Sequence, residues 1–285
     1  MSLEMELARR IAAGLGEIEG VVSVALGGSR ARGEGHPGSD IDLGIYYRAE
    51  SRPSLLELHR LAEELGYRHP GERVTDFGGW GPWINGGAWL QVEGHPVDWL
   101  FGEIGHITRI METCRAGKTA VHYQPGHPHG FHKHFYLGQI HYCRPLYDPE
   151  GVLKELKSLT EPYPPLLKET LIRDQLWEAR FALETCRKPA MRGDAYYVAG
   201  CLFRCASCMA QALFALNERY IVNEKGSISA ATTLPISPMD FEDTIHSTLA
   251  NPGESPEQLQ DTFRRLESLL RAVEELCRDH HSRPE

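Results

Sequence analysis

Two aspartates one residue apart, Asp40 and Asp42, stand at the start of the apolar segment IDLGIYY. On a strand, residues i and i+2 point to the same face, so the two carboxylates project side by side while Ile41 points into the core. Neighbouring carboxylates repel, and each resists ionisation unless a cation lies between them. Mg²⁺ is usually held by one or two carboxylates together with substrate phosphates. The pair indicates either a magnesium site or two exposed aspartates on the solvent face of an edge strand.

A glycine turn precedes this pair, where Gly27, Gly28 and Ser29 end the apolar run VVSVAL. The glycines allow a close approach of the backbone to a ligand, and Ser29 is expected to cap a short helix. A helix N-terminus binds phosphate through its free amide groups, although an ordinary strand-to-helix turn also uses glycine. The turn and the aspartate pair lie about a dozen residues apart. Brought to one sheet edge by two strands, they predict a metal–triphosphate site.

A third carboxylate, Asp98, lies in the apolar segment VDWLF. A charged residue in an apolar strand needs a partner or a metal ion. If this strand neighbours that of Asp42, Asp98 faces the same cation, as a ligand or as the base that takes a proton from an attacking hydroxyl. Metal-assisted phosphoryl transfer commonly uses two cations, which stabilise the attacking and leaving oxygens.

The elements that must position these residues change in type near residue 150. Before that point, β-type runs alternate with helical patterns, and after it only helical spacing is found. The predicted strands cover 21–27, 41–47, 73–78, 87–94 and 97–101, and the predicted helices of this part cover 3–15, 54–65 and 103–116. We therefore expect two domains, 1–150 with strands and helices and 151–285 with helices only.

Composition limits the class of protein. The chain has 285 residues, 41% of them hydrophobic and 24% charged, in the range of soluble globular proteins. A net charge of −9 argues against a nucleic-acid partner held by phosphate contacts. No segment is expected to match the roughly 20 apolar residues of a membrane span. Seven cysteines in a chain of this size favour reduced thiols and a cytoplasmic location.

Together, the segments GGSRARG, SDIDL and VDWLF resemble the polymerase-beta-type nucleotidyltransferase superfamily. The resemblance covers about residues 21–101 and is strongest to the two-domain proteins similar to aminoglycoside and lincosamide nucleotidyltransferases. It implies an α+β fold, in which a mixed-sheet nucleotidyltransferase domain is followed by an all-helical bundle domain. It also implies the transfer of a nucleoside monophosphate, usually AMP from ATP, to a hydroxyl group, with Mg²⁺ as cofactor.

The resemblance also assigns roles to individual residues. Asp40, Asp42 and Asp98 are expected to hold Mg²⁺ and to be catalytic. Six residues are expected to bind the nucleotide: Gly27, Gly28, Ser29, Arg32, Ser39 and Lys225. Of these, Gly28 and Ser29 are expected to contact the β- and γ-phosphates of the nucleotide. Each of the last three has a structural alternative. Arg32 could be a solvated helix residue, Ser39 a turn residue, and Lys225 an exposed lysine after a helix.

Two other patterns indicate metal chemistry less well. The segment 122–145 holds six of the fourteen histidines, and His-rich tracts bind zinc or nickel. Because no Glu or Cys was found to complete a familiar site, we expect a loop that contacts the acceptor. Cys201, Cys205 and Cys208 have the spacing of an iron–sulfur motif but lie in a helical pattern, where we expect them to be packed as small hydrophobes.

Three interpretations of the function stay open, and the first two differ in the acceptor of the nucleoside monophosphate. The first is a small hydroxylated molecule such as an aminoglycoside-like compound. The second is a hydroxyl of a protein partner, as in antitoxin-type members that adenylylate a toxin. The third is a nucleotide-binding protein without catalysis. Nucleic acid and membrane are not expected as partners.

Overall fold

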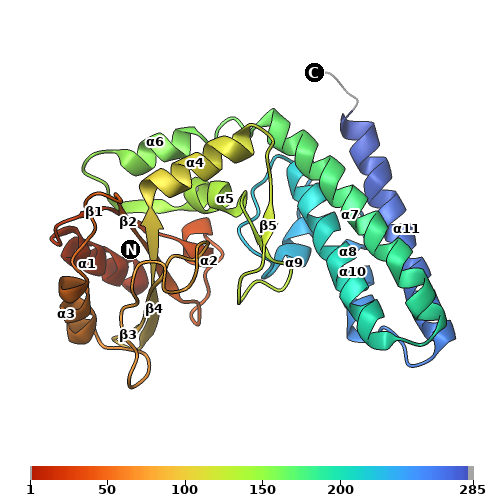
Figure 1. The fold of residues 1–285 in the computed structure, drawn as a ribbon, viewed down its shortest axis with the longest axis horizontal. Helices are drawn as coiled ribbons and strands as arrows, with labels where there is room; N and C mark the ends of the chain where they lie inside the picture. The colour runs from red at the N-terminus through yellow and green to blue at the C-terminus, as the bar shows by residue number, and fades with distance from the viewer. Residues whose placement is uncertain (1, 282–285) are drawn as a thin grey trace. The chain divides into compact units, whose positions relative to one another are not determined.

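The computed structural model describes residues 2–281 and divides the chain into two compact units (Figure 1). The first unit comprises the residues up to Thr113 together with Lys133–Pro162. The second comprises Cys114–His132 together with the residues from Tyr163 onward. The predicted domains, 1–150 and 151–285, stay a prediction, and the compact units differ from them because the chain crosses between the units three times.

A five-stranded mixed sheet forms the centre of the first unit, in the order β3-β4-β2-β1-β7. The strands β2 and β4 are parallel, and the other neighbours are antiparallel. The strands are β1 Val21–Leu26, β2 Ile41–Tyr47, β3 Gly87–Val92, β4 His95–Glu103 and β7 Arg144–Tyr147. This sheet, followed by a helical region, confirms the predicted α+β fold class.

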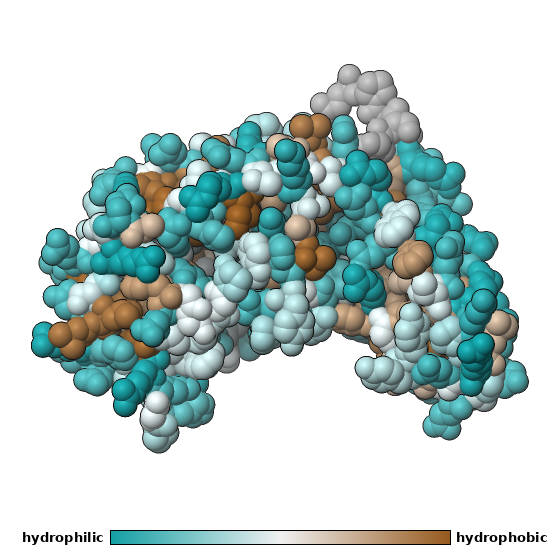
Figure 2. Space-filling model, in the orientation of Figure 1, coloured by the Kyte–Doolittle hydropathy of each residue, from teal (hydrophilic) through white to brown (hydrophobic). Residues whose placement is uncertain are grey.

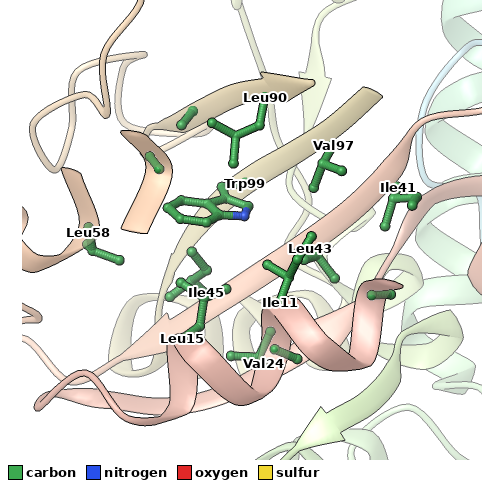
Figure 3. Close-up of a cluster of buried hydrophobic side chains, with 14 of the residues drawn as sticks. Ile11, Leu15, Val24, Ile41, Leu43, Ile45, Leu58, Leu90, Val97 and Trp99 are labelled. Atoms are coloured by element: carbon green, nitrogen blue, oxygen red, sulfur yellow. The ribbon is translucent and has the colours of Figure 1, made fainter. Parts of the chain in front are cut away.

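Helices cover the sheet of the first unit and bury its core (Figures 1 and 3). Ser2 caps the first helix by accepting from the amide of Met5, and the apolar side chains of that helix recur every three or four residues. Leu15 of this helix, Leu43 of β2 and Trp99 of β4 are almost completely buried in one cluster. The helices are α1 Leu3–Gly16, α2 Gly28–Arg32, α3 Leu55–Leu65, α4 Ile104–Arg115, α5 Phe135–Tyr142 and α6 Val152–Ser158.

The strand predicted at 73–78 is wrong, because this segment is a loop. Its backbone bonds to the sheet at Thr75, whose amide donates to the Gly87 carbonyl at 2.9 Å and whose hydroxyl accepts from the Gly87 amide. The glycines that follow turn the chain before a ladder forms. The segment 122–145 is also not only a loop, since it contains the short strand β6 Phe131–His132, paired with β5 Val121–His122, and the helix α5.

Long helices α7, α8 and α11 pack side by side in the second unit (Figure 1). The helix α11 begins at Pro256, and proline is favoured at the first position of a helix. The helices of this unit are α7 Pro165–Met191, α8 Ala195–Leu216, α9 Ser227–Thr232, α10 Phe241–Ala250 and α11 Pro256–His281.

The helix α8 corrects one expectation from composition. It has 22 residues and is apolar enough to cross a membrane by length and composition alone, so the prediction that no segment reaches this limit is wrong. In the structure, 78% of its most apolar window is buried, as in the core helix of a helical bundle. The face drawn in Figure 2 is mostly hydrophilic, with scattered apolar patches.

One lysine closes the C-terminal end of α5 in the first unit. Lys157 Nζ donates to the carbonyl oxygens of Ile140 at 3.1 Å, Cys143 at 2.9 Å and His141. Charged hydrogen bonds of this kind contribute about 1.5–3 kcal/mol each when a partner is lost, and a cation suits a helix C-terminus. We expect Lys157→Met to lower the free energy of unfolding by about 2 kcal/mol in urea titrations. The same change at exposed Lys154 should alter it by less than about 0.5 kcal/mol.

Candidate active site

The glycine turn joins β1 to α2 and is tied to β2. The Gly27 amide donates to the Asp42 carbonyl at 2.8 Å, and the Gly27 carbonyl accepts from the Ala31 amide. The helix begins at Gly28, with Gly27 at the N-cap position and no side-chain cap. The prediction that Ser29 caps this helix is therefore wrong, since Ser29 already lies inside its first turn. The amides of that first turn have no helical acceptor before them, and they form the part of the turn that a phosphate can contact.

Gly28 lies directly against the carboxylate of Asp42. Its φ of +61° is in the left-handed region, and a Cβ added there would come within 1.8 Å of Asp42 Oδ2. Only a residue without a side chain fits this conformation and this contact together. The structure thus brings the glycine turn and one of the predicted metal ligands into contact.

The three predicted carboxylates gather at one edge of the sheet. Asp42 of β2 and Asp98 of β4 are direct partners in the parallel register, and Asp40 precedes β2 by one residue. Both Asp40 and Asp42 raise the pKa of Asp98, which shows that their negative charges act on it. The predicted grouping of the three side chains is therefore present in the structure, and their role as metal ligands stays a prediction.

The surroundings of Asp98 raise the pKa of its carboxyl group. Burial is the largest cause that raises its pKa, from an ordinary 3.8 to about 6, and the charges of Asp42 and Asp40 add to the rise. The guanidinium of Arg68 acts in the opposite direction. The side chain is 17% exposed. Closely spaced carboxylate oxygens with excess negative charge form a ligand set that suits a hard cation such as Mg²⁺, so the residues present fit that ion.

Arg68 is the site residue that sequence reasoning missed. Its guanidinium lies 2.6 Å from Asp98 Oδ1 and 3.9 Å from Asp40 Oδ1. The Arg68 amide donates to the Trp89 carbonyl at 3.0 Å, which fixes the residue beside β3. No local motif marks this arginine, because only the pairing of its loop with β3 brings it to the carboxylates.

The remaining predicted residues have local partners. Arg32 pairs with Glu34 at 2.7 Å, and the Ser39 hydroxyl accepts from the His36 amide at 3.1 Å. Arg30 donates to the carbonyls of Ser39 and Asp40 and so holds the segment before β2 in place. Ser39 thus forms part of a turn.

Lys225 belongs to the second unit, where it is exposed. Its backbone amide donates to Asn223 Oδ1 at 2.9 Å. The predicted contact of its side chain with the nucleotide is neither supported nor opposed by these local contacts, and it stays a prediction.

Substitution of Gly28 tests the close approach of the turn to the carboxylate. Gly28→Ala introduces a left-handed alanine, at a cost of about 1–2 kcal/mol, and forces Asp42 away from the added methyl group. We expect a folded protein that is less stable by at least this amount and that binds ATP with Mg²⁺ at least tenfold more weakly, as measured by calorimetry. Gly71→Ala, where φ is also positive but the Cβ meets nothing within 4 Å, is the control that isolates the contact from backbone strain. Equal ATP affinity of the two variants would contradict the predicted role.

Comparisons with known proteins match two parts of this chain to family models. Residues 8–70 match the family described as "Nucleotidyltransferase domain", and residues 135–225 match "Domain of unknown function (DUF4037)". No curated protein matches the chain. Among solved structures, a nucleotidyltransferase-like protein from Exiguobacterium sibiricum is similar at 12% identity and a TM-score of 0.44, with 97% of this chain and 78% of that chain covered. The glycine turn, β2 and the pair Asp40 and Asp42 all lie in the segment 8–70 that matches the nucleotidyltransferase domain model.

Proposed function

We propose that the protein transfers a nucleoside monophosphate, AMP from ATP, to a hydroxyl group of a small molecule. The observation that carries this proposal is the register of the sheet, which pairs Asp42 with Asp98 while Gly28 packs on Asp42. The nucleotidyltransferase domain match supports the class of reaction. The hydroxylated acceptor, for instance an aminoglycoside-like compound, and a cytoplasmic location are part of the proposal.

Asp40, Asp42 and Asp98 would hold Mg²⁺ in this reaction. When bound, the metal ion neutralises charge on the carboxylates and the phosphates and favours attack at the α-phosphorus. The first-turn amides of α2 bind the phosphates that leave as pyrophosphate. The turn and the carboxylates together orient the α-phosphate toward the acceptor.

Asp98 is the residue best suited to accept the proton of the acceptor. The bond between the hydroxyl oxygen and the α-phosphorus forms as the bond from that phosphorus to pyrophosphate breaks, and the hydroxyl proton moves to the carboxylate. In the metal-free protein the pKa of this carboxyl is raised to about 6, chiefly by burial, which makes the group more basic than an ordinary aspartate. Arg68 contacts only Oδ1 of this carboxylate at 2.6 Å, and it positions the group for the transfer.

The direct test combines labelled ATP and Mg²⁺ with a panel of aminoglycosides and lincosamides. A product heavier by one AMP, released together with pyrophosphate and lost when the metal is chelated, is the expected result. AMP found on a protein that purifies with the chain would replace the small molecule by a protein acceptor. Thermal stabilisation by ATP without turnover on any acceptor would contradict catalysis and leave nucleotide binding alone.

A further inference from the structure

Three potential metal ligands from separate segments meet inside the second unit. They are His129, between β5 and β6, Glu178 on α7 and Cys208 on α8, and their ligand atoms all lie within 4.8 Å of one another. The expectation that no Glu or Cys accompanies the histidines of 122–145 is therefore wrong. The ligands are far apart in sequence, so only the packing of α7 and α8 against this segment brings them together.

The distance between two of these atoms fits a bound zinc ion. Cys208 Sγ lies 3.5 Å from His129 Nε2. Zinc bonds of about 2.0 Å to nitrogen and 2.3 Å to sulfur, at a tetrahedral angle, would separate the two atoms by about 3.5 Å. A thiol, an imidazole and a carboxylate are also the donors that Zn²⁺ combines in proteins. The arrangement needs little movement to accept an ion.

The other nitrogen of the imidazole has its own buried partners. His129 Nδ1 lies 3.2 Å from Gln211 Nε2 and 3.2 Å from His132 Nε2. The Gln211 Oε1 atom is buried without a hydrogen bond among the described residues. If the side-chain amide of Gln211 is rotated by 180°, Oε1 takes the place of Nε2. The oxygen then accepts a hydrogen bond from the Nδ1–H group of His129. Such a partner fixes the tautomer that leaves Nε2 for a metal ion.

The segment that carries His129 is held by a second carboxylate, Glu224. The His129 amide donates to Glu224 Oε1 at 3.0 Å, and His127 Nδ1 lies 3.0 Å from Glu224 Oε2. His129 and Cys208 are buried, whereas the Glu178 side chain is 21% exposed and pairs with Arg204. The ligands are thus positioned in advance, and only Glu178 of the three is partly exposed to solvent.

We propose that His129 Nε2, a carboxylate oxygen of Glu178 and Cys208 Sγ bind one zinc-class divalent ion, with a fourth position open to water. Binding exchanges the thiol proton of Cys208 for the ion, and the proton leaves to solvent. The site lies wholly in the second unit and does not depend on the proposed transferase reaction. The competing interpretation is a hydrogen-bonded network without metal.

The test is a Co²⁺ titration of the chelator-treated, full-length chain, followed by displacement with Zn²⁺ and metal analysis. We expect a thiolate-to-cobalt absorption band that saturates at one ion per chain, and a site of carboxylates alone does not produce such a band. Cys208→Ser should remove the band, and Glu178→Gln should weaken Co²⁺ binding at least tenfold. Gln211→Leu should weaken it by about 10–100-fold, as for other partners of metal-bound histidines.

The matched control is Cys205→Ser, which changes a buried cysteine one turn earlier on α8 and should keep the band. Glu178→Gln keeps the proposal testable if Cys208→Ser does not fold, because Glu178 is partly exposed. The absence of a thiolate band in the unchanged protein, or an equal loss in Cys205→Ser and Cys208→Ser, would overturn the proposal. Asp42→Asn should retain the band, which separates this outcome from a failure of the proposed function.

Discussion

Asp42→Asn is expected to lower nucleotidyl transfer at least a hundredfold while the fold stays intact. Asn has nearly the shape of Asp, so the contact with Gly28 and the packing of β2 are kept. What is lost is the negative charge that pairs with a cation opposite Asp98. Removal of one electrostatic contact at a reacting group typically costs about 10²–10³ in rate, and a lost metal ligand belongs at or above the upper end of that range.

The measurement is the initial rate of AMP transfer at saturating ATP and Mg²⁺, with an unfolding curve for each variant. Asp76→Asn makes the same chemical change at an exposed aspartate of the first unit and should keep the full rate. Retained activity in Asp42→Asn would remove the metal assignment. A lowered unfolding midpoint in that variant would instead indicate that Asp42 has a structural role.

Arg68 changes how the metal dependence should be interpreted. A guanidinium bonded to Asp98 and near Asp40 partly neutralises the carboxylates before any ion binds. The pKa of Asp98 is nevertheless raised to about 6. The remaining negative charge is what a divalent cation and a nucleotide would neutralise.

Local sequence patterns were sufficient where an element is long or strictly periodic. Period-two spacing identified β2 and β4, and three-four spacing identified α1, α3 and α4 to within a few residues. A strand was predicted at 73–78 because the residues there favour β-structure. The prediction is wrong because the glycines that follow end the pairing. The strands β5 and β6 have two residues each, too few to show a period.

The candidate sites divide in the same way. Asp40, Asp42 and the glycine turn are recognisable because they lie on adjacent strands of one short segment. Arg68 depends on how a loop pairs with β3, and the group around His129 depends on helix packing. Such contacts join residues that are distant in sequence, and neither composition nor periodicity contains them. From the sequence, Asp98 was expected beside Asp42 only if their two strands are neighbours. The structure shows that β2 and β4 are paired, with Asp42 opposite Asp98.

Asp98→Asn is expected to stabilise the metal-free protein near neutral pH while it abolishes transfer. The pKa of Asp98 is raised in the folded state from 3.8 to about 6, chiefly by burial. A raised carboxyl pKa means that the folded state favours the protonated group, so its stabilising contribution is complete below about pH 4 and is lost as the pH rises through about 6. One pKa unit corresponds to about 1.4 kcal/mol, so the ionised carboxylate costs up to about 3 kcal/mol at neutral pH.

The amide introduced by this substitution would avoid that cost because it carries no charge to desolvate. Urea unfolding at several pH values should show the variant more stable than the unchanged protein by roughly 1–3 kcal/mol above about pH 6, with the difference closing toward pH 4. Mg²⁺ should stabilise only the protein that retains Asp98, by an amount set by its concentration relative to Kd. Asp76→Asn should show none of these differences. If Asp98→Asn is instead less stable at neutral pH without metal, the ion pair with Arg68 outweighs the burial of the carboxylate. The conclusion that burial makes the ionised carboxylate of Asp98 unfavourable would then be wrong.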